Sequence, residues 1–83
     1  MVNDGEYVAI FNSIHRVMKA EKLLKERRLA ILLIPAPRVL KSDCGLALRY
    51  SEAEREGVLR ALAEEDLAPE EIYVKKGEEY VRI

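Results

Sequence analysis

The order in which two hydrophobic periodicities alternate along this 83-residue chain is the feature that most restricts its fold. Short, continuously apolar runs predict strands, whereas apolar residues that recur every three or four positions predict amphipathic helices. In chain order the segments read strand, helix, strand, strand, helix, strand, and a short strand-like segment follows at the end. Few folds accept this order, because both helices must cover the sheet that the strands form.

Apolar runs and capping residues set the expected boundaries of these elements. The strand-like runs are residues 7–11, 29–34, 46–50, 72–74 and 80–83. The helices are expected from residue 14 to about residue 28, and from about residue 52 to near residue 66. Ser13 suits an N-cap of the first helix. Ser51 and Glu54 match a capping box, which predicts the start of the second helix.

This order of elements is that of the ferredoxin-like βαββαβ fold, which belongs to the α+β class. We therefore expect residues 1–83 to form a single domain with an antiparallel sheet, two helices on one face and a short extra C-terminal strand. The expected spatial order of the first four strands is 4-1-3-2. This topology brings the start of the first helix and the loop of residues 35–45 to the same end of the sheet.

Composition and charge exclude several classes of function. Lys and Arg total 14 against 15 Asp and Glu, so no net positive field attracts nucleic acid or an acidic membrane surface. Residues 1–6 lack the features of a signal peptide, and no apolar stretch is long enough to span a bilayer. We expect a soluble, cytoplasmic protein that binds neither nucleic acid nor membrane.

The only cysteine, Cys44, is the best candidate for a functional residue. It lies in a polar loop that contains Gly45, and the predicted topology puts it beside the N-terminus of the first helix, whose partial positive charge favours a thiolate. A lone cysteine also leaves a thiol free of internal disulfides. The residues expected to bind at or activate this site are His15, Pro37, Arg38, Lys41, Ser42 and Gly45.

Each of these residues also has a plain structural interpretation. Cys44 could be a packing residue, and His15 could be a solvated residue near a helix start. Arg38 could be an anion contact or a surface charge, and Pro37 could stiffen the loop. One Cys and one His lack the paired spacing of zinc ligands, so we expect no metal and no cofactor.

Four sequence segments carry a resemblance to a known family. The chain reads Tyr-Val-Ala-Ile-Phe at 7–11, Ser-Ile-His at 13–15, Ile-Pro-Ala-Pro-Arg at 34–38 and Ser-Asp-Cys-Gly-Leu-Ala-Leu at 42–48. Over nearly its entire length the chain thereby resembles the family of small selenium/sulfur (Se/S) carrier protein-like proteins. The most specific part is Pro-x-Pro-Arg followed by Ser-x-Cys-Gly, which puts the expected carrier thiol at Cys44.

The resemblance implies a carrier function. A persulfide or selenopersulfide would be held on Cys44 and passed between sulfurtransferase-type donor and acceptor proteins. Such a protein is transferase-like and depends on its partners for turnover. A competing hypothesis is a ferredoxin-like regulatory module that binds a small anion or a protein and gives Cys44 no covalent role. The fold does not decide between the two.

The strands also suggest an assembly. Residues 7–11 and 29–34 are apolar on both faces, whereas the sheet face without helices is normally polar enough to meet water. An exposed apolar patch would mark an interface. The sequence therefore predicts a homodimer, or docking to a partner, through this open face, with residues 80–83 as an alternative cover.

Overall fold

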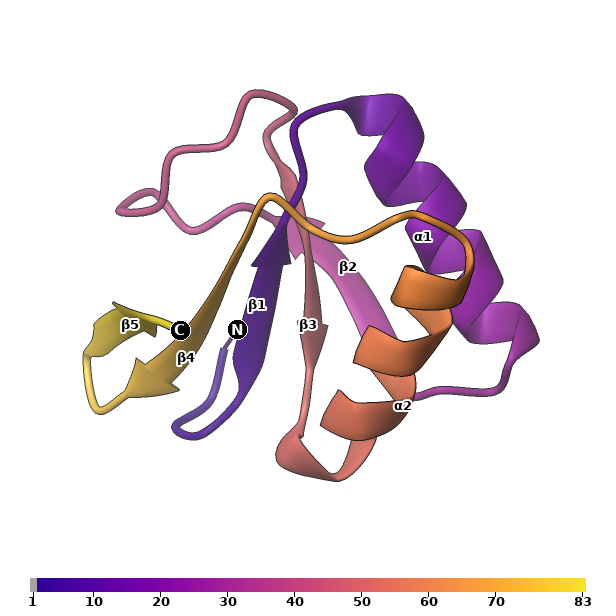
Figure 1. Cartoon of the computed structure of the whole chain (residues 1–83). Helices are drawn as coiled ribbons and strands as arrows, with labels where there is room; N and C mark the ends of the chain where they lie inside the picture. Colours follow the sequence, from indigo (N-terminus) through magenta and orange to yellow (C-terminus); the bar gives the residue numbers. More distant parts are fainter. Residues whose placement is uncertain (1) are drawn as a thin grey trace.

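The computed structural model, which describes residues 2–83, has two helices packed on one face of a five-stranded antiparallel sheet (Figure 1). The elements are β1 (Tyr7–Ile10), α1 (Ile14–Glu26), β2 (Ile31–Pro35), β3 (Leu46–Tyr50), α2 (Glu52–Glu64), β4 (Glu71–Lys76) and β5 (Glu79–Arg82). The strands lie in the order β2-β3-β1-β4-β5. This confirms the ferredoxin-like α+β fold, the 4-1-3-2 order and the extra C-terminal strand.

Both helices end in the same backbone motif, which explains why they stop earlier than expected. Arg28 and Asp66 have positive φ angles of 60° and 55°, directly after the C-cap residues of α1 and α2. The next residues, Leu29 and Leu67, donate their backbone N–H groups to Leu24 and Leu62 at 3.0 and 2.8 Å. These bonds form a Schellman motif at each helix end. Residue 29 therefore belongs to the end of α1, and β2 begins only at Ile31.

The two helices begin differently. Ser13 caps α1 as expected, because its Oγ accepts the backbone N–H of Arg16 at 3.1 Å. Ser51 occupies the N-cap position of α2, but its side chain makes no capping hydrogen bond. The backbone N–H of Glu54 instead donates to the carbonyl of Ser51. The sequence pattern thus predicted the position of this helix start correctly and the side-chain bonds of the capping box wrongly.

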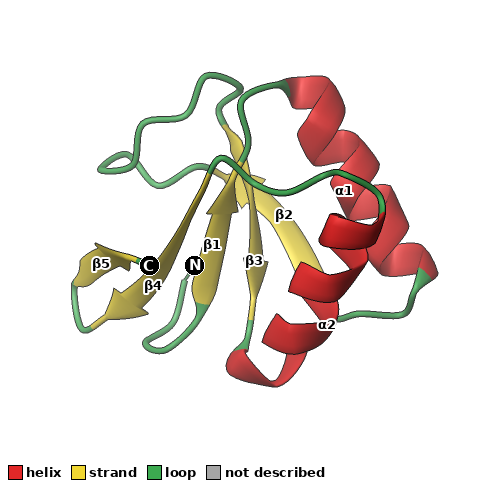
Figure 2. Cartoon of the chain, viewed as in Figure 1, coloured by secondary structure: helices red, strands yellow, loops and turns green. Residues whose placement is uncertain are grey.

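Both helices lie on one face of the sheet (Figure 2). The larger hydrophobic core consists of side chains from the helices and from this face of the sheet. Leu24 from α1, Leu48 from β3 and Leu62 from α2 are fully buried there. A side chain at Gly57 of α2 would meet the Leu29 side chain at 2.9 Å. The absence of a side chain at position 57 therefore lets Leu29 pack against α2.

A second, smaller core covers the opposite face of the sheet, which corrects the expectation of an exposed apolar face. Val8 and Ile34 on this face are 0% and 3% exposed. They are buried in the same cluster as Leu40 from the β2–β3 loop, with Tyr80 of β5 packed against it. Because the monomer covers this face itself, the reason for expecting a dimer through it no longer holds.

Leu40 provides a test of this cover. Its side chain is buried although its neighbour Val39 is 76% exposed. Replacing Leu40 by Ala is expected to lower the free energy of unfolding by about 2–5 kcal/mol, because it leaves a cavity in the smaller core. Val39→Ala should change it by about 0.5 kcal/mol or less. Urea denaturation of both variants measures the difference, and equal effects would contradict the burial of Leu40.

Tyr50 gives a pH-dependent test of the larger core. Its ring stacks on Tyr7 at 5.5 Å between centroids, and its buried hydroxyl has no hydrogen-bond partner among residues 2–83. Burial raises the pKa of Tyr50 from 10.0 to about 12. The unfolded chain therefore loses this proton at lower pH than the folded protein, and stability should fall between about pH 10 and 12. Tyr50→Phe should reduce this alkaline loss. The denaturation midpoint of each protein, measured as a function of pH across that range, tests this expectation. If the midpoint falls equally steeply with pH in both proteins, the expectation is wrong.

Candidate functional site

The loop that carries Cys44 joins β2 to β3, and two backbone hydrogen bonds and one buried side chain fix its conformation. The backbone N–H of Ala36 donates to the carbonyl of Gly45 at 2.9 Å and closes the base. The N–H of Leu40 donates to the carbonyl of Pro37 at 2.9 Å, which makes a tight turn. The Leu40 side chain is buried in the smaller core. Together these contacts fix a loop that sequence alone described only as a connection.

The thiol of Cys44 is half-buried and packs against the edge of the larger core. Its Sγ lies 3.3 Å from the carbonyl oxygen of Leu46 and 3.6 Å from that of Phe11. The hydroxyl of Ser42 lies 3.6 Å from the same sulfur, and either group could donate. The thiol therefore has two acceptors for its own proton and one hydroxyl that can donate to the sulfur.

This environment differs in one respect from the one the topology predicted. The contact with Phe11 confirms that Cys44 lies near the junction of β1 and α1, because α1 begins three residues later at Ile14. The contact is to a carbonyl oxygen, however, and the N–H group of Arg16 in the first turn of α1 is capped by Ser13. Polar contact with the thiol therefore comes from Ser42 and from backbone carbonyls.

A hollow of about 210 Å³ opens beside the loop that carries Cys44. It shares Phe11 and Ser42 with the contacts of Cys44, and three carboxylates and one lysine lie around it. The charged residues that line it are Lys41, Asp43, Glu70 and Glu71. Glu71 also accepts the Tyr73 hydroxyl at 2.9 Å and pairs with Arg82 at 3.2 Å. The hollow thus has a net acidic lining.

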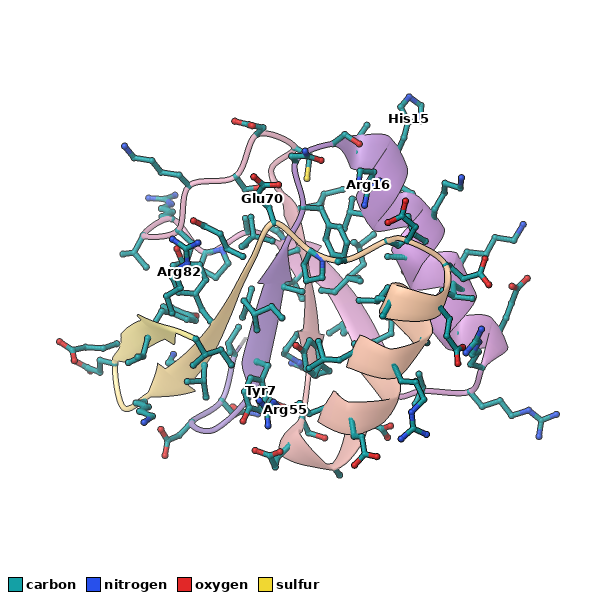
Figure 3. The ribbon with its side chains drawn as sticks, viewed as in Figure 1. Tyr7, His15, Arg16, Arg55, Glu70 and Arg82 are labelled. Atoms are coloured by element: carbon teal, nitrogen blue, oxygen red, sulfur yellow. The ribbon has the colours of Figure 1, made fainter. Side chains whose placement is uncertain are left out.

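The structure brings together only some of the site residues that the sequence suggested. Ser42 contacts the thiol, and Lys41 lines the adjacent hollow. Gly45 follows the thiol with a positive φ of 74°, a conformation that disfavours other residues. Arg38 is exposed at the tip of the turn that begins at Pro37. His15 is exposed, and its ring points from α1 into solvent (Figure 3).

Sequence analysis missed the acidic residues that β4 contributes to this end of the molecule. The backbone N–H of Glu70 donates to the carbonyl of Ile10 at 2.7 Å, which holds the start of β4 beside the end of β1. Figure 3 shows Glu70 at this end of the sheet. The predicted strand order contained the signal, because an antiparallel neighbour of β1 must begin where β1 ends. Glu70 lies 26 positions from Cys44 and does not stand out in the sequence.

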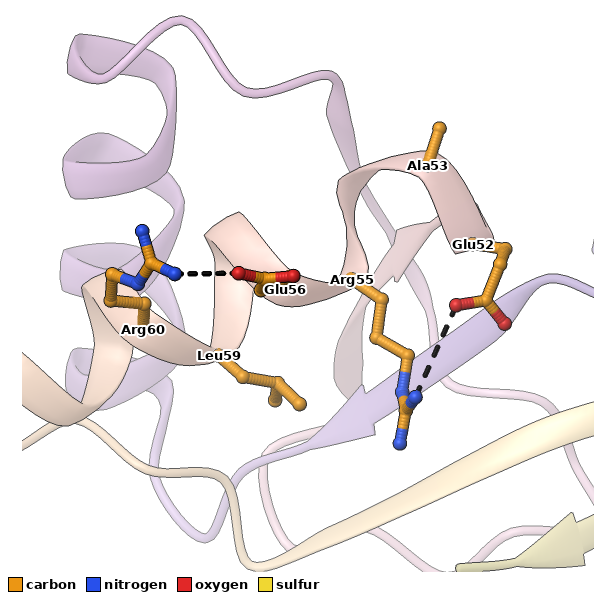
Figure 4. A pocket seen from close by; sticks show the side chains of 6 residues that line it. All are labelled: Glu52, Ala53, Arg55, Glu56, Leu59 and Arg60. Carbon is orange, nitrogen blue, oxygen red and sulfur yellow. Dashed lines mark hydrogen bonds and ion pairs between the residues drawn. The ribbon is translucent and has the colours of Figure 1, made fainter.

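A larger hollow, of about 630 Å³, lies on the outer surface of α2 (Figure 4). Its arginines are already paired within the helix, Arg55 with Glu52 at 4.0 Å and Arg60 with Glu56 at 2.6 Å. Such exposed pairs between successive turns are ordinary helix-surface contacts. The residues that line this surface include no thiol or hydroxyl group, so Cys44 remains the candidate site.

Two further findings concern metals and membranes. Within residues 2–83, no group of three or more His, Cys, Asp and Glu side chains is placed to hold a metal ion. In the same part of the chain, neither helix has the length and apolar character needed to cross a bilayer.

Comparison with known proteins supports the resemblance noted in the sequence. The family described as "Putative Se/S carrier protein-like" matches residues 6–74, a range that contains Cys44. A protein of Aquifex aeolicus (strain VF5) named "Putative sulfur carrier protein" is 36% identical over 75 residues, which are 88% of this chain and 38% of that protein. The chain thus spans about two-fifths of this relative's length. No solved structure gives a significant match. The family match shows that the chain belongs to the Se/S carrier protein-like family.

Proposed function

We propose that Cys44 accepts a persulfide sulfur, or the corresponding selenium, from a donor protein and passes it to an acceptor protein. The observation that carries the proposal is the placement of the chain's only thiol at the edge of the core, in a braced loop beside an open hollow. Family membership and the name of the Aquifex aeolicus relative support the same function.

The proposed transfer is balanced without an added oxidant or reductant. The Cys44 sulfur attacks the outer sulfur of a donor persulfide, so that a new Sγ–S bond forms while the S–S bond of the donor breaks. The donor cysteine leaves as a thiolate and takes up the proton that Cys44 gives up. The acceptor thiol then repeats the exchange and restores the Cys44 thiol. Because the chain has no second cysteine, no internal disulfide can form and release the carried sulfur as sulfide.

The residues around the thiol fit such a carrier. Half-burial against the core restricts the access of free thiols to Sγ, and the Ser42 hydroxyl can donate to the sulfur when it is negatively charged. The space next to Gly45 is open, because a side chain there would meet nothing within 4 Å. A partner protein could therefore bring its own chain close to the loop.

Charge around the hollow argues for a protein partner over a free anion. Arg82 pairs with Glu71, but Asp43 and Glu70 still outnumber Lys41, so a small anion in the hollow would face net repulsion. A donor or acceptor with basic residues would be attracted to the same surface. This disfavours the alternative of an anion-binding regulatory module and supports delivery of the sulfur from another protein's cysteine.

The decisive experiment is intact-protein mass spectrometry after incubation with a cysteine persulfide donor. We expect an adduct of one sulfur atom that a reducing agent removes, and none on Cys44→Ser. A parallel reaction with a selenide-derived donor distinguishes sulfur from selenium. A folded protein that takes up neither element would reject the carrier function and leave the protein-binding module as the explanation.

The charge of the loop can be tested separately. Lys41→Gln should slow alkylation of Cys44 by a negatively charged reagent more than by a neutral reagent, because Lys41 lines the hollow next to the Cys44 loop. The difference should shrink at high salt, since exposed charges are screened over about 10 Å at ~0.1 M.

Arg38→Gln is the matched control for this measurement. Arg38 is at the exposed tip of the turn, so its removal should have a smaller effect on the anionic reagent. If Arg38→Gln has the larger effect, Arg38 is the cation that acts on the thiol.

A further inference from the structure

The sheet has an edge strand that the described part of the chain leaves open. β2 is the last strand in the order and pairs only with β3. All of its residues, Ile31–Pro35, are apolar. Soluble proteins usually protect such edges with charges, proline or a covering segment. The opposite edge, β5, carries the exposed residues Glu79 and Arg82, whereas Pro35 is the one protective residue in β2.

The register of β2 shows which backbone groups face outward. Ala36 donates to Gly45, and in the same register Ile34 lies opposite Ala47 and Leu32 opposite Arg49. Antiparallel pairs alternate between those that exchange hydrogen bonds and those that do not. The backbone groups of residues 32 and 34 therefore form hydrogen bonds with β3. Those of Ile31, Leu33 and Pro35 point to the free edge. Pro35 has no N–H, so the open donors are those of Ile31 and Leu33.

We propose that this edge is a homodimer interface in which β2 pairs antiparallel with β2 of a second copy, about a two-fold axis at Leu32. In this register Ile31 of each copy exchanges both backbone hydrogen bonds with Leu33 of the other. All the open donors of Ile31 and Leu33 then find acceptors, and the two five-stranded sheets join into one of ten strands.

Pro35 selects this register over its neighbour. An axis at Leu33 would set Ile31 of one copy against Pro35 of the other. The proline ring would then occupy the place of a donor, and the carbonyl of Ile31 would lose a bond. With the axis at Leu32, Pro35 lies beyond the paired segment. A second copy of β2 therefore matches this edge in length and in its pattern of donors and acceptors.

Exposed apolar side chains flank the same edge. Leu32 is 45% exposed and would face its own copy across the axis, in a pair without hydrogen bonds where side chains are closest. On α1, Ile14 and Met18 are 51% and 45% exposed. They lie on the flank of α1 opposite Arg16, which donates to the Asp66 carbonyl beyond the end of α2. This flank faces the β2 edge, so dimerisation would bring these residues toward the interface.

In the proposed dimer the Cys44 thiols of the two copies lie far from each other. The Cys44 thiol contacts the carbonyl of Phe11, just after the central strand β1, and that of Leu46 in β3. Antiparallel pairing points the loop ends of the two copies in opposite directions. Each copy would keep its own accessible thiol. The interface therefore stands independently of the proposed carrier function.

The test is sedimentation equilibrium with charge substitutions at the two-fold axis. The wild-type protein should sediment at micromolar concentration with twice the 9.5 kDa mass of the chain. Leu32→Lys and Leu32→Glu should each be monomeric, because identical charges would face each other. An equimolar mixture of the two should recover the dimer, since opposite charges then meet. Val39→Lys and Val39→Glu are matched controls at an exposed site on the loop and should remain dimeric.

A second variant keeps the test decisive if the charged variants unfold. Leu32→Cys in a Cys44→Ser background should form an intermolecular disulfide under mild oxidation, because a pair of this kind has the Cα separation that a disulfide needs. Val39→Cys in the same background is the control and should not cross-link. A monomeric wild-type protein, Leu32 variants that stay dimeric, or failure of Leu32→Cys to cross-link would each overturn the proposal.

Discussion

Everything else in this structure depends on the burial of β1 at the centre of the sheet. All four of its residues are buried, and it pairs antiparallel with β3 on one side and β4 on the other. Tyr7 and Ala9 face the helices, while Val8 and Ile10 face the smaller core. A central strand that is apolar on both faces requires cover on both sides. The helices provide one cover, and the other must come from loops and the C-terminal hairpin.

That requirement links the second cover to the candidate site. Leu40 belongs to the cluster that buries Val8 and Ile10, and four residues later the same loop carries Cys44. Leu40 holds one part of the loop on one face of the sheet, while the thiol packs at the edge of the core on the other. The loop is therefore fixed by hydrophobic burial as well as by its two backbone hydrogen bonds. A fixed loop gives the thiol a defined environment, which the proposed transfer of a sulfur atom would require.

The thiol end of the molecule and its β2 edge therefore differ in charge and polarity. At the thiol end, side chains from three separate segments gather around an acidic hollow. Along the β2 edge the surface is apolar and presents open backbone groups. Charged surfaces mainly guide encounters with partners, whereas strand edges pair through the backbone. The proposed sulfur exchange and the proposed self-association would therefore use separate surfaces of the molecule.

The sequence by itself determined the element order, the strand order and the position of the thiol near the start of α1. The element order follows from local periodicity and the N-cap at Ser13, which depend on residues close in the chain. The strand order and the place of the thiol then follow because few topologies accept that order of elements. Only the tertiary structure decided that Leu40 covers the open face together with Tyr80, from the 80–83 segment that the sequence offered as an alternative cover. It also decided that Glu70 lines the hollow next to the Cys44 loop, and that carbonyl oxygens contact the sulfur. These features join residues far apart in sequence, and a loop residue such as Leu40 has no periodic neighbours to reveal its burial. The assembled sheet determines which side chain packs on which surface, and local sequence patterns do not predict these contacts.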